Sequence, residues 1–185
     1  MIKNLRKISE KKQIKKNYKP IIQKTIIGLV LIIIAGFFVY NNLIKKTEPA
    51  MEYYTFTKEG ELVLSDSLGN AKVKIDIEIA NTDYDQQLGL MKRVSMGEKQ
   101  GMLFILSSDE MRSFWMRNTL ISLDMIFMGS NKKIVTIHKN TKILSNQSYP
   151  STSPAQYVLE VNAGFTDKYK VNVGDVISWS VIPKL

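Results

Sequence analysis

The chain has 185 residues, a formal net charge of +9 at pH 7 and no cysteine. Its charge is uneven, because residues 1–50 contain 11 Lys/Arg and two acidic side chains, whereas residues 51–185 contain 15 of each kind. A nucleic-acid-binding domain carries its excess positive charge on the folded part, so the balance over residues 51–185 excludes that class. The absence of cysteine excludes disulfides, thiolate metal sites and a cysteine nucleophile.

The first predicted element is an apolar helix that crosses a membrane. Residues 26–40 contain no charged side chain, and the wider apolar run over residues 25–44 is interrupted only by Asn41 and Asn42. A helix of that length spans about 30 Å, the thickness of the hydrocarbon core of a bilayer. A cleaved signal peptide is the alternative, but no small-x-small cleavage motif follows the run, so an uncleaved anchor is favoured.

The basic side chains before the apolar run predict its orientation. Nine Lys/Arg precede it, and positive charge of this kind stays in the cytoplasm and attracts anionic lipid. Residues 1–24 are therefore expected to form a cytoplasmic tail, and residues 45–52 a linker. Residues 53–185 are expected to form an extracytoplasmic domain, periplasmic or extracellular, of a single-pass cell-membrane protein.

The predicted domain opens with strands and one short helix. Residues 72–80 (KVKIDIEIA) alternate apolar and charged side chains, which is typical of a strand with one face in water. An edge strand over residues 56–64 and a turn at residues 66–70 are expected before it. Thr82 is placed to cap a helix that continues as far as Arg93.

The rest of the domain is predicted to consist mainly of short strands. The apolar runs and turn residues predict strands at residues 102–106, 113–116, 123–128, 133–138, 157–161 and 175–182, a loop at 145–154 and a short helix at 165–170. The third and fourth of these strands form a hairpin through Gly129-Ser130-Asn131. The prediction is a mainly β (α+β) fold, a small closed or half-closed barrel of about seven or eight strands with two short helices.

Five motifs in order carry a resemblance to a known family. They are EIANTDYDQQLGLMKR, GMLFIL, FWMRNTLISLDMIF, YPSTSPAQYVLEVNAG and VGD, and in them the chain resembles the family called domain of unknown function 192. The resemblance implies a compact β-rich domain of the kind that is exported or membrane-attached, with no assigned reaction and with sugar binding as a suggested role. Asp83, Ser122 and Phe165 depart from the family's usual proline, proline and tryptophan.

Two carboxylates interrupt the apolar pattern of the predicted strands. They are Asp124 and Glu160, and a carboxylate on an apolar strand face is either paired inside the protein or lines a pocket. The structural alternative is capping of backbone N–H groups or pairing with Arg93, Arg112 or Arg117. The functional alternative is a ligand pocket, whose predicted members are Trp115, Arg117, Asn118, Asp124, Glu160 and Asn162. A tryptophan offers a flat face to a sugar ring, and the polar side chains offer hydrogen bonds.

Metal and cofactor chemistry is not predicted. His138 is the one histidine, which cannot form a histidine-rich zinc site, and it is expected to be a surface or hydrogen-bonded side chain. Seven methionines lie between residues 91 and 128. They could bind copper through thioethers, although methionine in apolar strands is more commonly core. No cofactor and no metal ligand is therefore assigned.

Three functions remain open. The favoured hypothesis is a membrane-anchored extracytoplasmic binding or accessory module for a carbohydrate or another small polar ligand. The first alternative is a hydrolase of an envelope glycan, with Asp124 and Glu160 as its acid and base. The second alternative is a protein-interaction domain without a small-molecule site. No oligomeric state follows from the sequence.

Overall fold

The computed structural model describes residues 2–44 and 54–183, and the side chains of residues 21–42 and 54–183. The chain divides into two compact units, Met1–Ala50 and Met51–Leu185. The whole predicted linker, residues 45–52, and the first residue of the predicted domain lie outside the described residues.

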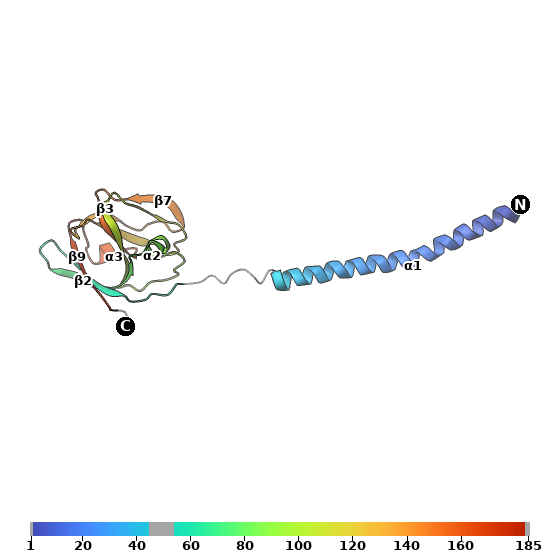
Figure 1. Cartoon of the computed structure of the whole chain (residues 1–185), viewed down its shortest axis with the longest axis horizontal. Helices are drawn as coiled ribbons and strands as arrows, with labels where there is room; N and C mark the ends of the chain where they lie inside the picture. The colour runs from blue at the N-terminus through green and yellow to red at the C-terminus, as the bar shows by residue number, and fades with distance from the viewer. Residues whose placement is uncertain (1, 45–53, 184–185) are drawn as a thin grey trace. The chain divides into compact units, whose positions relative to one another are not determined.

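The described part of the N-terminal unit, residues 2–44, is one long helix. It consists of α1 (Ile2–Val39) and a π-helical turn η1 (Tyr40–Ile44) (Figure 1). The segment Ile21–Asn42 has a mean hydropathy of 2.3 and none of it is buried, so its apolar side chains are exposed. It is therefore long and apolar enough to cross a membrane. The helix begins well before the predicted start at residue 25.

The second unit is built mainly from strands. A seven-stranded sheet has the order β6-β5-β8-β3-β2-β1-β9, and a two-stranded sheet pairs β4 with β7. The strands are β1 (Gly60–Ser65), β2 (Ala71–Ala80), β3 (Gln100–Glu110), β4 (Ser113–Met116), β5 (Leu123–Met128), β6 (Ile134–His138), β7 (Ser145–Pro150), β8 (Ala155–Asn162) and β9 (Val176–Val181) (Figure 1). The β2–β3 pair is parallel, and the other pairs are antiparallel.

The large sheet does not close into a barrel, so the closed form of the predicted closed or half-closed barrel is wrong. Its edge strands β6 and β9 meet only near one end, through an isolated bridge between Lys133 and Val176. Backbone N–H groups of Ile134 and Gly174 donate across this contact to the carbonyls of Asp175 (2.8 Å) and Ile134 (2.9 Å). A barrel needs a continuous ladder between its first and last strands, and among the described residues this bridge does not extend into one.

The sheet is buried on both faces in its central strands. Every residue of β5 is buried, and because side chains alternate along a strand, they supply two separate cores. One face carries Ile126 and Leu159 of the first core, which also includes Phe165. The other face carries Phe127 and Val158 of the second core, which also includes side chains of β4 and β7.

Two short helices complete the domain. In α2 (Asp83–Leu88) the Thr82 hydroxyl accepts a hydrogen bond from the Asp85 N–H (3.2 Å), which confirms the predicted N-cap. The helix stops at Gly89, which has φ +49°, a backbone conformation that favours glycine. The predicted extension to Arg93 is therefore wrong. Helix α3 (Phe165–Lys168) confirms the short helix expected there.

Two further predictions are corrected by strand pairing. β1 is not an edge strand, because it lies between β2 and β9. The predicted loop at residues 145–154 contains β7, whose Pro150 and Tyr149 are the partners of Ser113 and Phe114 in β4. This pairing forms a separate two-stranded sheet whose side chains pack on the second-core face of the large sheet, and it positions Trp115 of β4 for the site described next.

Candidate functional site

Glu160 lies in the middle of a row of side chains on one face of the large sheet. Its neighbours across the strands are Met102 in β3 and Met125 in β5. One strand further out, Glu78 is the partner of Met102 and His138 is the partner of Met125. The two nearest cross-strand side chains are therefore apolar, and they separate Glu160 from the ionisable groups at both ends of the row.

Glu160 faces a small cavity between this sheet face, β4 and the end of α2. The cavity has a volume of about 40 Å³, which is room for a few water molecules. Its lining residues are Gln86, Gln87, Leu88, Gly89, Leu90, Met91, Phe104, Phe114, Trp115, Thr119 and Glu160. A Cβ on Gly89 would stand 3.2 Å from the Phe104 ring, so the absence of a side chain lets the turn after α2 approach the aromatic wall.

The Glu160 carboxyl has no hydrogen-bond or ion-pair partner among the described residues, although its residue is only 5% exposed. Burial raises its pKa to about 8. Two polar side chains of the lining are already engaged: the Gln86 amide donates to the Ile105 carbonyl (2.8 Å), and the Thr119 hydroxyl donates to the Arg117 carbonyl (3.3 Å). The cavity therefore presents a carboxyl group whose hydrogen-bonding capacity is unused.

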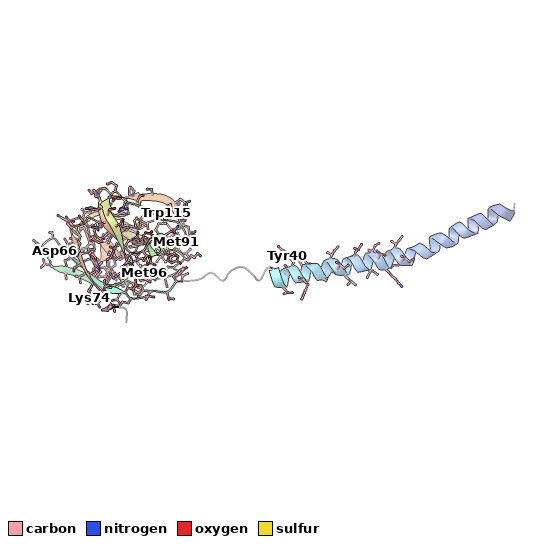
Figure 2. The ribbon with its side chains drawn as sticks, viewed as in Figure 1. Tyr40, Asp66, Lys74, Met91, Met96 and Trp115 are labelled. Atoms are coloured by element: carbon pink, nitrogen blue, oxygen red, sulfur yellow. The ribbon has the colours of Figure 1, made fainter. Side chains whose placement is uncertain are left out.

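Trp115 lines the same cavity and is half-exposed. The Arg117 guanidinium lies over the indole ring, 4.5 Å from its centroid, and donates to the Asn146 side-chain oxygen (3.1 Å). The Asn118 amide donates to the Met91 sulfur (3.9 Å). Figure 2 labels Trp115 and Met91 on the same side of the domain. Of the predicted site residues, Trp115 and Glu160 thus line one cavity, and Arg117 and Asn118 contact residues that line it.

Asp124 lies on the opposite face of the sheet, because its partner in β8 is Val161 and not Glu160. It is fully buried and accepts four hydrogen bonds. The donors are the N–H groups of Asn140 (2.9 Å), Gly164 (3.3 Å) and Thr166 (2.9 Å) and the Thr166 hydroxyl (2.7 Å). This carboxylate joins the start of α3 to the turn after β6, and the structure does not bring it together with Glu160.

Asn162 and the three arginines also lie outside the cavity. The Asn162 amide donates to the carbonyls of Met96 (2.9 Å) and Gly97 (3.0 Å). None of the arginines pairs with Asp124 or Glu160, so the predicted arginine pairing is wrong. Their contacts are with other groups: Arg93 with Glu78 (3.0 Å), Arg112 with the carbonyls of Ser108 (2.6 Å) and Ala155 (3.3 Å), and Arg117 with Asn146.

Several residues of the site were not among those predicted from the sequence. The turn after α2 supplies Leu90 and Met91, and β3 and β4 supply Phe104 and Phe114. The five sequence motifs that carry the family resemblance contain a signal for these residues. Four of the five motifs contribute to the lining: the first supplies residues 86–91, the second Phe104, the third residues 114, 115 and 119, and the fourth Glu160.

The structure also locates the residues considered for metal binding. His138 lies 2.7 Å from the Pro150 carbonyl and packs against Phe127 and Tyr149. Met116 and Met125 are fully buried in the apolar core. Within residues 54–183 and the described part of the helix, no three His, Asp or Glu side chains are grouped to hold a metal ion.

Comparisons with known proteins identify the family. The model of DUF192, described as "Uncharacterized ACR", matches residues 65–179. The UPF0127 protein PF1050 of Pyrococcus furiosus is 26% identical over 114 residues, covering 59% of this chain and 90% of its own length. A UPF0127 protein of Thermococcus sibiricus is 28% identical over 107 residues, covering 57% of this chain and 66% of its own length.

Two solved structures are similar over the same region. A Sinorhizobium meliloti protein, provisionally named a transcription regulator, has 33% identity and a TM-score of 0.63, over 69% of this chain and 98% of its own. A protein of unknown function from Novosphingobium aromaticivorans has 32% identity and a TM-score of 0.61, over 64% of this chain and 84% of its own. These matches confirm the family resemblance, and the chain belongs to the DUF192 family.

Proposed function

We propose that the chain is a membrane-anchored extracytoplasmic module whose domain binds a small polar ligand at the Glu160 cavity. The observation that carries this proposal is a buried carboxyl group without a partner, facing a cavity beside the half-exposed Trp115. Buried polar groups are normally hydrogen-bonded, and an exception calls for a water, an ion or a ligand. A ligand that donates to Glu160 would supply the missing hydrogen bond.

The size of the cavity limits how a ligand would bind. A volume of about 40 Å³ accepts a single polar head group and not a whole sugar ring. A carbohydrate would therefore insert one hydroxyl group toward Glu160 and lay its ring against Trp115. The same arrangement suits any small molecule that has a hydrogen-bond donor next to an apolar or ring-shaped body.

A binding role fits the site better than hydrolysis. Glycoside hydrolysis uses two carboxyl groups that flank the scissile bond, whereas Glu160 is the one carboxyl group among the described residues that line the cavity. Asp124 lies on the other face of the sheet with its oxygens occupied. The regulator name of the Sinorhizobium meliloti relative would suggest DNA binding, but the even charge of residues 51–185 does not favour it.

Tryptophan fluorescence of the full chain in lipid nanodiscs tests the ligand site. The chain has two tryptophans, so Trp179→Phe leaves Trp115 as the reporter, and Trp115→Phe leaves Trp179 as the matched control. We expect a panel of monosaccharides, small diols and small amines to include a ligand that changes Trp115 emission and leaves Trp179 emission unchanged. Glu160→Gln should weaken that ligand about tenfold or more. No response of Trp115 to any member of the panel at millimolar concentration would contradict the proposal.

Membrane anchoring is tested separately by fractionation. The chain should remain with membranes after an alkaline wash, and protease added outside the cell membrane should remove the domain. The double substitution Ile32→Arg and Ile33→Arg should release the chain, because each arginine near the bilayer centre costs about 2.5–3.5 kcal/mol. Leu68→Arg, at an exposed position in the domain, is the control that should leave fractionation unchanged. Retention of the double variant in the membrane would contradict the anchor.

A further inference from the structure

The walls of the Glu160 cavity contain aromatic rings and no basic side chain. Phe104, Phe114 and Trp115 contribute rings to the lining, and the first two pack edge to face with their centroids 5.1 Å apart. Aromatic faces attract cations. A cation that entered the cavity would thus meet both a carboxyl group and aromatic rings.

The charged and titratable groups nearest to Glu160 form their ion pairs and hydrogen bonds with other residues. Beyond Met102, Arg93 is paired with Glu78 through Nη2, with nitrogen and oxygen 2.8 Å apart, whereas its Nε and Nη1 are buried without a hydrogen-bond partner. Beyond Met125, His138 is bonded to the Pro150 carbonyl. On the β4 side, Arg117 lies over the Trp115 ring and donates to Asn146. No described side chain therefore supplies a counter-charge to Glu160.

The geometry points to a small primary amine as the ligand, with its ammonium group inserted into the cavity against Glu160; this inference rests on the proposed function. An ammonium group has three N–H donors, and its hydrogen bond to a carboxylate is stronger than that of a neutral hydroxyl group. A neutral ligand would form a hydrogen bond with the carboxyl group but would supply no counter-charge to its ionised form. An anionic ligand would be repelled.

The size of the cavity favours a small cation over a bulky one. About 40 Å³ accommodates an ammonium group and the carbon attached to it, and the remainder of the molecule would extend past Trp115. A quaternary ammonium is larger and has no N–H donor for the carboxylate. Ethanolamine, ethylene glycol and choline therefore form a matched set of probes: a primary ammonium, its neutral counterpart and its quaternary counterpart.

The ammonium should make binding depend on pH. Without a ligand, burial holds the pKa of Glu160 at about 8, so below pH 8 the carboxyl group must lose its proton when the cation binds. The affinity for ethanolamine should then rise about tenfold for each pH unit between pH 6 and pH 8. The affinity for ethylene glycol should not rise in this range, because a neutral ligand does not need an ionised carboxyl group.

The test uses the full-length Trp179→Phe chain in nanodiscs, with Trp115 emission measured at pH 6, 7 and 8. We expect ethanolamine to bind at least about tenfold more tightly than ethylene glycol or choline at pH 8. Glu160→Gln should weaken ethanolamine binding by a similar factor and abolish its pH dependence. The control Glu98→Gln changes an exposed carboxylate that is bonded to Tyr169 and Lys168, and it should leave ethanolamine binding unchanged.

The outcomes separate this inference from the proposed function. If ethylene glycol or a sugar binds through Glu160 while ethanolamine does not, the ammonium inference is overturned and the binding module stands. If choline binds as tightly as ethanolamine, the ammonium is not inserted into the cavity, and the inference is overturned. If no probe, neutral or charged, changes Trp115 emission, the proposed function and the inference both fail. Circular dichroism of each variant shows that it is folded before it is compared.

Discussion

Replacing Asp124 by alanine should lower the free energy of unfolding by about 4–6 kcal/mol. Asp124 is fully buried and accepts hydrogen bonds from three backbone N–H groups and one hydroxyl group. Without the carboxylate these buried donors lose their acceptor, and each unsatisfied group costs about 1–3 kcal/mol. Since a domain of this size is stable by only about 5–15 kcal/mol, the variant should unfold at much lower urea concentration or fail to fold.

The nearby Asp167 provides a matched control. Its carboxylate is 63% exposed and is bonded to Lys139 (2.6 Å), a surface ion pair of the kind that contributes little to stability. Asp167→Ala should therefore change the free energy of unfolding by less than about 0.5 kcal/mol. Urea unfolding followed by far-UV circular dichroism measures both variants. Equal stabilities for Asp124→Ala and the wild type would show that the buried carboxylate does not stabilise the fold.

Strand alternation was enough to predict the central part of this fold. Residues 72–80 alternate because β2 has one apolar face and one with charged side chains, and the hairpin of β5 and β6 follows from two apolar runs joined by Gly129-Ser130-Asn131. β7 was missed because SNQSYP has no apolar alternation. Its strand exists because it pairs with β4, a contact between segments that are distant in the sequence.

The difference between a local sequence pattern and strand pairing also explains why the site could be predicted only in part. An acidic residue inside an apolar strand is visible in the sequence, so Asp124 and Glu160 could both be identified as unusual. Which face each one occupies depends on the register between β5 and β8, where Met125 is the partner of Glu160. A shift of one residue exchanges the two faces. The sequence therefore indicated two exceptional carboxylates but not that one is a structural acceptor and the other faces a cavity.

The number of predicted strands does not determine whether the sheet closes into a barrel. Closure depends on whether the first and last strands share a continuous ladder, and here β6 and β9 share one isolated bridge. Helix length posed a similar problem, because Tyr84, Leu88 and Met91 have helical spacing in the sequence. The helix nevertheless ends at Gly89, whose positive φ turns the chain back toward Phe104. This turn also forms one wall of the Glu160 cavity.

The stability of the domain should fall as pH rises from about 5 to 8, and Glu160→Gln should abolish this fall. In the unfolded chain the carboxyl group titrates near its usual pKa of 4.5, whereas burial raises the pKa in the folded domain to about 8. Between these values the folded state holds a proton that the unfolded state has released, so the free energy of unfolding decreases with pH. The shift corresponds to a loss of up to about 5 kcal/mol by pH 9.

The other groups whose pKa is shifted titrate outside this pH window. Hydrogen bonds from Lys74 and Lys58 lower the pKa of Glu61 to about 2, and Lys168 lowers the pKa of Glu98. A lowered carboxyl pKa contributes stability that is lost only as pH falls, below about pH 4.5. Hydrogen bonds to Glu98 raise the pKa values of Lys168 and Tyr169 above their usual 10.5 and 10.0. The interval from pH 5.5 to 9 therefore isolates Glu160 from these groups.

Urea unfolding of the wild type and Glu160→Gln at several pH values measures this effect directly. The unfolding free energy of Glu160→Gln minus that of the wild type should increase by about 1.4 kcal/mol per pH unit between pH 5.5 and pH 8. Above pH 8 this difference should become constant. Glu98→Gln, at an exposed carboxylate, should show no such shift in this window. A pH-independent difference for Glu160→Gln would mean that the carboxyl group ionises in the folded domain without cost. Glu160 would then already have a counter-charge or a set of donors in the free protein, and its cavity would have no need of a ligand that supplies them.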